Sequence, residues 1–281
     1  MFDYRMQFAE ATDSLARIHF RPSGMVLPTG ATYTGTLTGP QCRYARTLPA
    51  VFPVRDVDGT AEVLITEPCY WTADLPFLYD LRVDVRQEGA IVASSERSIG
   101  LRRLSFRGSS VFVEGKRFVF RAAHLPSDKP IDWQAWRAAR LAMYAVDPHD
   151  ELCRAASEQG VWIIAETSAA ATANRVMNWP AVAVVAPPTS ERGDVERGPG
   201  GPLIAGRETS EESAQRIVRA DIMVHVVQNV ASAKRDLVGR SQPVFAVRSI
   251  EGSGTLAAAR AECEQLQRDL SPELNLAGYI V

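Results

Sequence analysis

The sequence lacks several features that would place a protein in a functional class at once. Its 281 residues carry a net charge of −2, so no basic surface for nucleic acid or an anionic membrane is indicated. No apolar run reaches the roughly 18–20 residues of a membrane span. The first residues, MFDYRMQFAEATDS, include acids and no apolar core, unlike a secretory signal. We therefore expect a cytoplasmic protein that binds neither nucleic acid nor membrane.

Cysteine is scarce and scattered. Cys42, Cys69, Cys153 and Cys263 lie far apart and form no C-x-x-C pair. This spacing favours reduced thiols over a zinc site or a disulfide framework. No cluster of histidine, cysteine and aspartate has the spacing of metal ligands either. We therefore expect neither a metal nor a cofactor.

The first part of the chain alternates short β-rich runs with turn signals. In the run 79–87, Val83 and Val85 alternate with Arg82 and Asp84, which indicates one buried and one solvent-facing side. The regular spacing of such runs predicts a β-sandwich over residues 13–105, preceded by an N-terminal tail over 1–12. The other runs cover residues 14–22, 32–39, 60–66 and 90–100.

The second part alternates buried strands with helices. The segment 147–160 predicts a helix, with Pro148 in its first turn and Gly160 at its end. The segment 209–219 predicts another, which opens with a capping box. Eight such strands predict a compact (β/α)₈ barrel over residues 106–281. Their apolar runs cover residues 118–125, 141–146, 161–166, 181–186, 202–206, 221–227, 243–247 and 275–281.

Several motifs near the junction of the two parts match one known family. Trp71 to Leu81 fits a W-[ST]-x-x-x-P-x-L-Y-x-L pattern, residues 99–102 fit F-G-[IF]-R, and residues 114–116 fit an N-G-K-like turn. Together with the segments 150–166 and 178–191, they resemble glycoside hydrolase family 2, the β-galactosidase and β-glucuronidase family. The resemblance implies an immunoglobulin-like sandwich followed by a TIM-type barrel.

The same resemblance implies the position of a catalytic pair. Retaining glycosidases of this kind use two carboxylic acids about 5–5.5 Å apart, and in this family they follow the fourth and seventh barrel strands. At the seventh strand, the family pattern P-[IVL]-x-x-x-E places Arg248 at the nucleophile position. Arginine stays protonated and cannot form a glycosyl-enzyme ester. At the fourth strand, an alignment without gaps places Thr189 and Ser190 where the family has Asn-Glu, and Glu191 follows one residue later.

These departures predict a degenerate, catalytically inactive family member that binds a carbohydrate or a protein. The alternative is an active glycoside hydrolase that uses relocated carboxylates, namely Glu191, Glu166 and Glu251. A structural or assembly role is a third hypothesis, and the sequence leaves the oligomeric state open. The residues expected to meet at the strand ends could bind an anionic sugar or another carboxylate, or pair with one another; they are Arg121, His124, Tyr144, Glu166 and Arg248.

Overall fold

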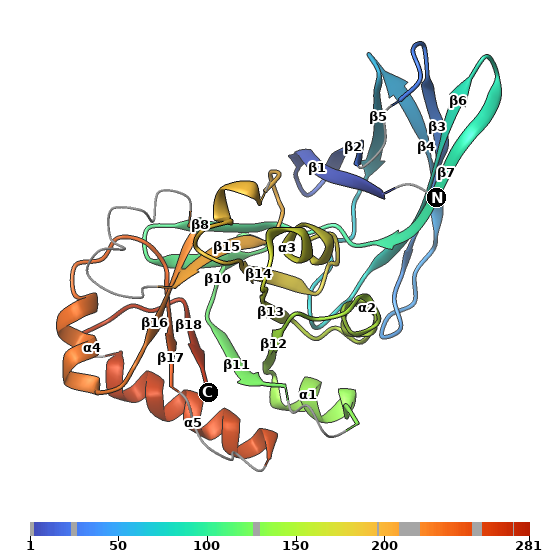
Figure 1. Cartoon of the computed structure of the whole chain (residues 1–281). Helices are drawn as coiled ribbons and strands as arrows, with labels where there is room; N and C mark the ends of the chain where they lie inside the picture. Colours follow the sequence, from blue (N-terminus) through green and yellow to red (C-terminus); the bar gives the residue numbers. More distant parts are fainter. Residues whose placement is uncertain are drawn as a thin grey trace. The chain divides into compact units, whose positions relative to one another are not determined.

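The computed structural model of the chain divides into two compact units (Figure 1). The first holds residues 1–103 with the short segments 178–180 and 198–201, and the second holds the remainder. The helix expected over 209–219 and Glu251 lie outside the described residues. Those described are 3–23, 27–125, 130–195, 197–207, 220–248, 255–271 and 273–281.

The first unit is built on one antiparallel sheet of seven strands in the order β1-β2-β5-β4-β3-β6-β7. Strand β4 changes partner along its length, because residues 50–54 pair with β3 and residues 55–57 pair with β5. This change curls the sheet into two faces that enclose one core, which confirms the predicted sandwich. The strands are β1 Asp3–Ala11, β2 Leu15–Ser23, β3 Thr32–Gln41, β4 Ala50–Val57, β5 Thr60–Thr66, β6 Leu78–Gln87 and β7 Ala90–Ile99.

The tail expected over residues 1–12 is wrong for residues 3–11, which form β1. This strand pairs antiparallel with β2, with Tyr4 opposite Pro22 and Phe8 opposite Ile18. Tyr4 and Phe8 are both buried in the sandwich core. Their alternation with polar residues is the pattern of a strand with one buried face.

The motif at residues 99–102 has a structural explanation within the first unit. A Cβ atom on Gly100 would lie 2.6 Å from Cβ of Pro180, so only glycine fits there. The fully buried Arg102 donates from Nη1 to the carbonyl oxygens of Trp179 and Pro180, at 3.0 Å each. This motif therefore fixes the segment 178–180 against the end of β7.

The second unit begins with a small antiparallel sheet and continues as a closed barrel of eight parallel strands. The small sheet has β8 Leu104–Arg107, β9 Ser110–Val113 and β10 Lys116–Phe118. Strand β18 pairs with both β17 and β11 and so closes the barrel, as the sequence predicted. The barrel strands are β11 Phe120–His124, β12 Ala142–Val146, β13 Ile163–Glu166, β14 Val182–Ala186, β15 Leu203–Arg207, β16 Ile222–Val226, β17 Val244–Val247 and β18 Gly278–Ile280.

Helices connect the barrel strands and cover the outside of the barrel. Helix α2 ends at Gly160 with a left-handed residue, as predicted. The sulfur of Cys263 on α5 lies 3.4 Å from the carbonyl oxygen of Ala122 in β11, so α5 packs directly on the barrel wall. The helices are α1 Trp133–Ala139, α2 Asp150–Gln159, α3 Ala170–Val176, α4 Val230–Leu237 and α5 Leu256–Leu270, with a 3₁₀ turn, η1, at Arg192–Asp194.

Alternation along the strands decides which side chains face the barrel interior. A Cβ atom on Gly278 would lie 2.8 Å from the ring of Phe245, and the Phe120 ring lies 5.7 Å from the same ring, so these residues face inward. In-register residues of neighbouring parallel strands share a face. Phe120 is in register with Gly278, and Arg121 is in register with Tyr279. Arg121 and Tyr279 therefore face outward, toward the surrounding helices.

Candidate functional site

Four polar side chains meet where barrel strands end, at the mouth of the barrel. They are His124 of β11, Tyr144 of β12, Glu166 of β13 and Arg207 of β15. The Tyr144 hydroxyl donates to Oε2 of Glu166. Arg207 donates from Nη2 to the same oxygen at 2.6 Å and to the Tyr144 hydroxyl at 2.5 Å. One carboxylate oxygen is therefore held by two donors at once.

Burial controls the protonation of the two rings in this cluster. The His124 ring lies 4.6 Å from the Tyr144 ring, and burial lowers the pKa of His124, with Glu166 opposing this shift. His124 is therefore neutral at pH 7. Burial, and then the hydrogen bond to Glu166, raise the pKa of Tyr144, so its hydroxyl stays protonated and remains a donor.

The charged part of the cluster is open to a ligand. The Glu166 and Arg207 side chains keep 25% and 44% of their surface exposed. Both contacts of Glu166 involve Oε2. Among the described residues, Oε1 of Glu166 has no hydrogen-bond partner. The mouth thus presents an acceptor on Glu166 beside the guanidinium donors of Arg207.

The fourth and seventh strands present apolar side chains to the mouth. Ala186 at the end of β14 is in register with Glu166, and Val247 at the end of β17 is in register with Ile280 and Val226. By the alternation above, all five face inward. The final inward positions of the two strands that carry the catalytic carboxylates in retaining family members are therefore alanine and valine.

The expected cluster is corrected at two positions, Arg121 and Arg248. Arg121 donates from Nη2 to Oε1 of Gln267 on α5 at 2.5 Å. Arg248 lies 3.6 Å from the carboxylate of Asp269 on the same helix. Each arginine lies one residue away from an inward-facing position of its strand. Its side chain therefore lies on the outer side of the barrel wall, which the helices cover. Of the residues expected from the sequence, only His124, Tyr144 and Glu166 come together.

Of the other two expected carboxylates, Glu191 and Glu251, the structure describes only Glu191. Glu191 accepts the backbone N–H of Ala170, the first residue of α3, at 2.7 Å. The N-cap residue of that helix, Ala169, supplies no side-chain cap. Glu191 therefore caps α3 from a distant part of the sequence. Glu251 lies outside the described residues.

Arg207 is the member of the cluster that the sequence did not predict. The apolar run predicts a strand that stops at Gly206, whereas β15 continues through Arg207. The signal was the alternation of Leu203, Ala205 and Arg207, which puts the arginine on the inward face. A charged residue at the C-terminal end of an apolar strand, on the same face as the inward residues of that strand, indicates a polar group at the barrel mouth.

In the part of the chain that the structure describes, no three His, Cys, Asp or Glu side chains come together in a way that could hold a metal ion. Within the same residues, no helix is long and apolar enough to cross a membrane.

The fold defines a class of architecture, in which a β-sandwich precedes a TIM-type barrel. Residues 41–102 match the model described as Glycosyl hydrolases family 2, which confirms the resemblance expected from the sequence over that part of the chain. No curated protein matches the sequence.

Solved structures share the fold over the whole chain. A glycosyl hydrolase family 2 member from Bacteroides cellulosilyticus has a TM-score of 0.72 at 13% identity, over 99% of this chain and 43% of that one. The β-glucuronidase of Bacteroides uniformis has a TM-score of 0.67 at 11% identity, over 99% and 45%. The β-glucuronidase of Ruminococcus gnavus has a TM-score of 0.68 at 12% identity, over 99% and 60%. This chain spans less than half the length of the first two.

Proposed function

We propose that this chain is a degenerate member of glycoside hydrolase family 2 that binds a carbohydrate at the barrel mouth without hydrolysing it. The observation that supports this most strongly is the set of inward residues at the strand ends. A retaining mechanism needs one carboxylate to attack the anomeric carbon and a second to donate a proton. Here the fourth and seventh strands end in Ala186 and Val247, and the carboxylate that joins the polar cluster, on Glu166, belongs to the third strand.

The state of Glu166 also favours binding over catalysis. An attacking carboxylate needs a free approach to carbon, and a general acid must carry a proton near neutral pH. The contacts of Glu166 with Arg207 and Tyr144 instead hold one oxygen as an acceptor. A carboxylate accepting two such donors is well suited to receive a further hydroxyl donor from a ligand on its other oxygen.

A sugar supplies the groups that match this mouth. Its hydroxyls can donate to Oε1 of Glu166 and accept from the remaining N–H groups of Arg207. A carboxylate on the sugar would add a charged contact to the guanidinium. The exposed Val146 and Val226, 62% and 52% accessible at the ends of β12 and β16, offer apolar surface for the C–H groups of a ring.

Binding can be tested by titrating the purified chain with galactose, mannose and glucuronate in a calorimeter. We expect at least one of them to bind, with glucuronate favoured by Arg207. Glu166→Gln and Arg207→Gln should each weaken binding about tenfold, because each removes a charged hydrogen bond. The matched controls are Glu158→Gln and Arg154→Gln, an exposed ion pair on α2 whose change should leave binding intact.

The same preparation should be assayed with aryl β-galactoside, β-glucuronide and β-mannoside. No turnover is expected above that of the Glu166→Gln variant. Turnover that disappears in Glu166→Gln or Glu191→Gln would contradict the proposal and favour relocated catalytic carboxylates. Absence of binding of all three sugars would contradict the binding role itself.

A further inference from the structure

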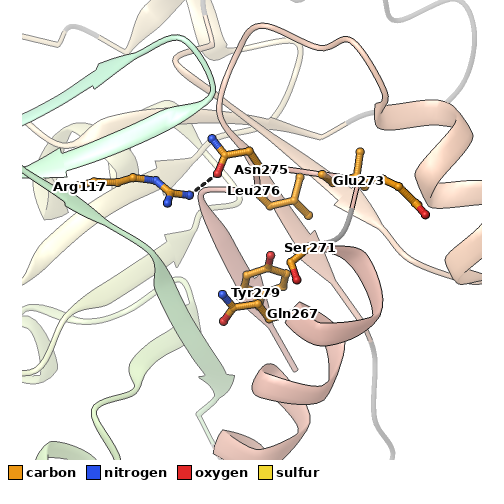
Figure 2. A pocket seen from close by; sticks show the side chains of 8 residues that line it. Arg117, Gln267, Ser271, Glu273, Asn275, Leu276 and Tyr279 are labelled. Carbon is orange, nitrogen blue, oxygen red and sulfur yellow. Dashed lines mark hydrogen bonds between the residues drawn. The ribbon is translucent and has the colours of Figure 1, made fainter.

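A second polar cavity lies at the opposite end of the barrel from the mouth. Arg117 of β10 comes just before β11, residues 274–276 come just before β18, and Gln267 and Ser271 lie at the C-terminal end of α5. All these positions are at the N-terminal ends of the barrel strands, so we name the cavity the floor pocket. It encloses about 370 Å³, within the range of small-molecule sites. Figure 2 shows its lining: Arg117, Gln267, Ser271, Glu273, Leu274, Asn275, Leu276 and Tyr279.

The floor pocket carries positive charge that its own residues do not neutralise. Arg117 donates to the amide oxygen of Asn275, and Arg121, beside the pocket, donates to that of Gln267. Both acceptors are neutral. Among the described residues, no carboxylate lies within ion-pair distance of either guanidinium.

The carboxylates near this wall already have cationic partners. Glu273, which lines the pocket, accepts from Nζ of Lys234 at 2.8 Å. Glu264, on the α5 turn beside Arg121, accepts from Arg260 at 2.7 Å. Arg117 is therefore a cation that an incoming anion can reach and pair with, since four of its five N–H groups make no contact with the described residues.

Uncharged hydrogen-bonding groups surround this cation. Tyr279 faces outward from β18 beneath α5, and among the described residues its hydroxyl has no hydrogen-bond partner. Gln267 uses its amide oxygen for Arg121, which leaves its amide N–H groups for another acceptor. Ser271 adds a hydroxyl at the C-cap of α5. The lining is thus suited to a ligand with both an anionic group and hydroxyls.

We propose that the floor pocket binds a small hydroxylated organic anion, a carboxylate or a phosphate ester, whose charge pairs with Arg117. The hydroxyls of the ligand then bond to Tyr279, Gln267 and Ser271. Floors of TIM barrels contribute mainly to stability, and enzyme chemistry takes place at the mouth. This site is consequently separate from the mouth and does not depend on the function proposed for it.

The test is a calorimetric titration of the full chain with glucose 6-phosphate, gluconate and glucose. We expect one or both anions to bind about tenfold more tightly than glucose, because glucose lacks the negative charge that pairs with Arg117. The Arg117→Gln variant should lose this preference, whereas Arg117→Lys should keep part of it. Arg107→Gln changes an arginine of the neighbouring strand β8 that does not line the pocket, and should have no effect.

Further variants separate the floor pocket from the mouth. Arg207→Gln should leave the binding event that Arg117→Gln abolishes unchanged, and Ser271→Ala should weaken that event less than Arg117→Gln does. Binding of both anions supports a site for either group, and binding of one identifies which group is recognised. The proposal would be overturned if glucose bound as tightly as the anions, or if neither anion bound. It would also be overturned if Arg207→Gln abolished anion binding and Arg117→Gln did not.

Discussion

Arg207, at the end of the fifth barrel strand, forms an ion pair with Glu166, at the end of the third strand, with an N–O distance of 2.6 Å. The pair spans the end of the fourth strand, which lies between them. That intervening strand ends in Ala186, which is in register with Glu166. In a retaining family member the end of this fourth strand carries the general acid. The Arg207–Glu166 pair therefore lies beside the strand end at which such an enzyme carries that acid.

The first prediction concerns the strength of this pair. A double-mutant cycle of Glu166→Gln and Arg207→Gln, followed by urea unfolding, should give a coupling free energy of about 0.2–1 kcal/mol, because both side chains are partly exposed to solvent. Each single change alone should alter the free energy of unfolding by a similar amount. A coupling energy of zero would show that the two residues do not pair in solution.

The second prediction is a dependence of stability on pH. Burial lowers the pKa of His124 in the folded chain below its ordinary value of 6.5, so the unfolded chain binds the proton more readily. The contribution of this group to stability is therefore complete above pH 6.5 and is lost as the pH falls through the folded pKa. His124→Gln should reduce the slope of stability against pH in this window. A titration of the His124 ring by NMR with a midpoint above 6.5 would contradict the prediction.

The third prediction concerns thiol reactivity. Burial raises the pKa of Cys263 to about 11, and Cys153 is completely buried, whereas Cys42 and Cys69 are partly exposed. Since the thiolate is the reactive form, iodoacetamide at pH 8 should label only Cys42 and Cys69 in the folded chain and all four cysteines after unfolding. Mass spectrometry of the labelled peptides measures this. Equal labelling of Cys263 and Cys42 in the folded chain would be inconsistent with the packing of α5.

The fourth prediction separates a structural from a catalytic role for Glu191. If its carboxylate caps α3, Glu191→Ala should reduce the free energy of unfolding by about 1 kcal/mol, and Glu191→Gln by less, because an amide oxygen still accepts the Ala170 N–H. Sugar binding at the mouth should persist in both variants. Equal stability of all three chains would argue against the cap.

The barrel could be predicted strand by strand because parallel strands are buried on both sides. Such strands give continuous apolar runs, and every barrel strand except β15 falls within the expected range; β15 extends one residue further, to Arg207. In the sandwich, β1 is hard to recognise from the sequence because its apolar residues alternate with polar ones near the start of the chain, where we expected a tail. Strand β4 was missed because Pro53 lies within it, and proline is uncommon inside strands.

The site was only partly predictable, since a shift of one residue reverses the face of a strand. Glu166 and Tyr144 were expected at the mouth from the family resemblance of the third and second barrel strands, and the structure brings them together there. Arg121 and Arg248 were assigned by family motif, and each lies one residue away from an inward position. Contacts such as that between Glu166 and Arg207 join residues 41 positions apart, and the sequence pattern contains no signal for them.

We propose that the mouth binds a sugar without the double displacement of a retaining glycosidase. The most direct test is incubation with 2-deoxy-2-fluoro glycosides that carry a dinitrophenyl leaving group, in the galactosyl, glucuronyl and mannosyl series, followed by intact mass measurement. A retaining enzyme accumulates a covalent glycosyl adduct on its nucleophile. We predict that the mass of the chain stays unchanged. A stoichiometric mass increase that peptide mapping places on Glu166, Glu191 or Glu251 would contradict the account.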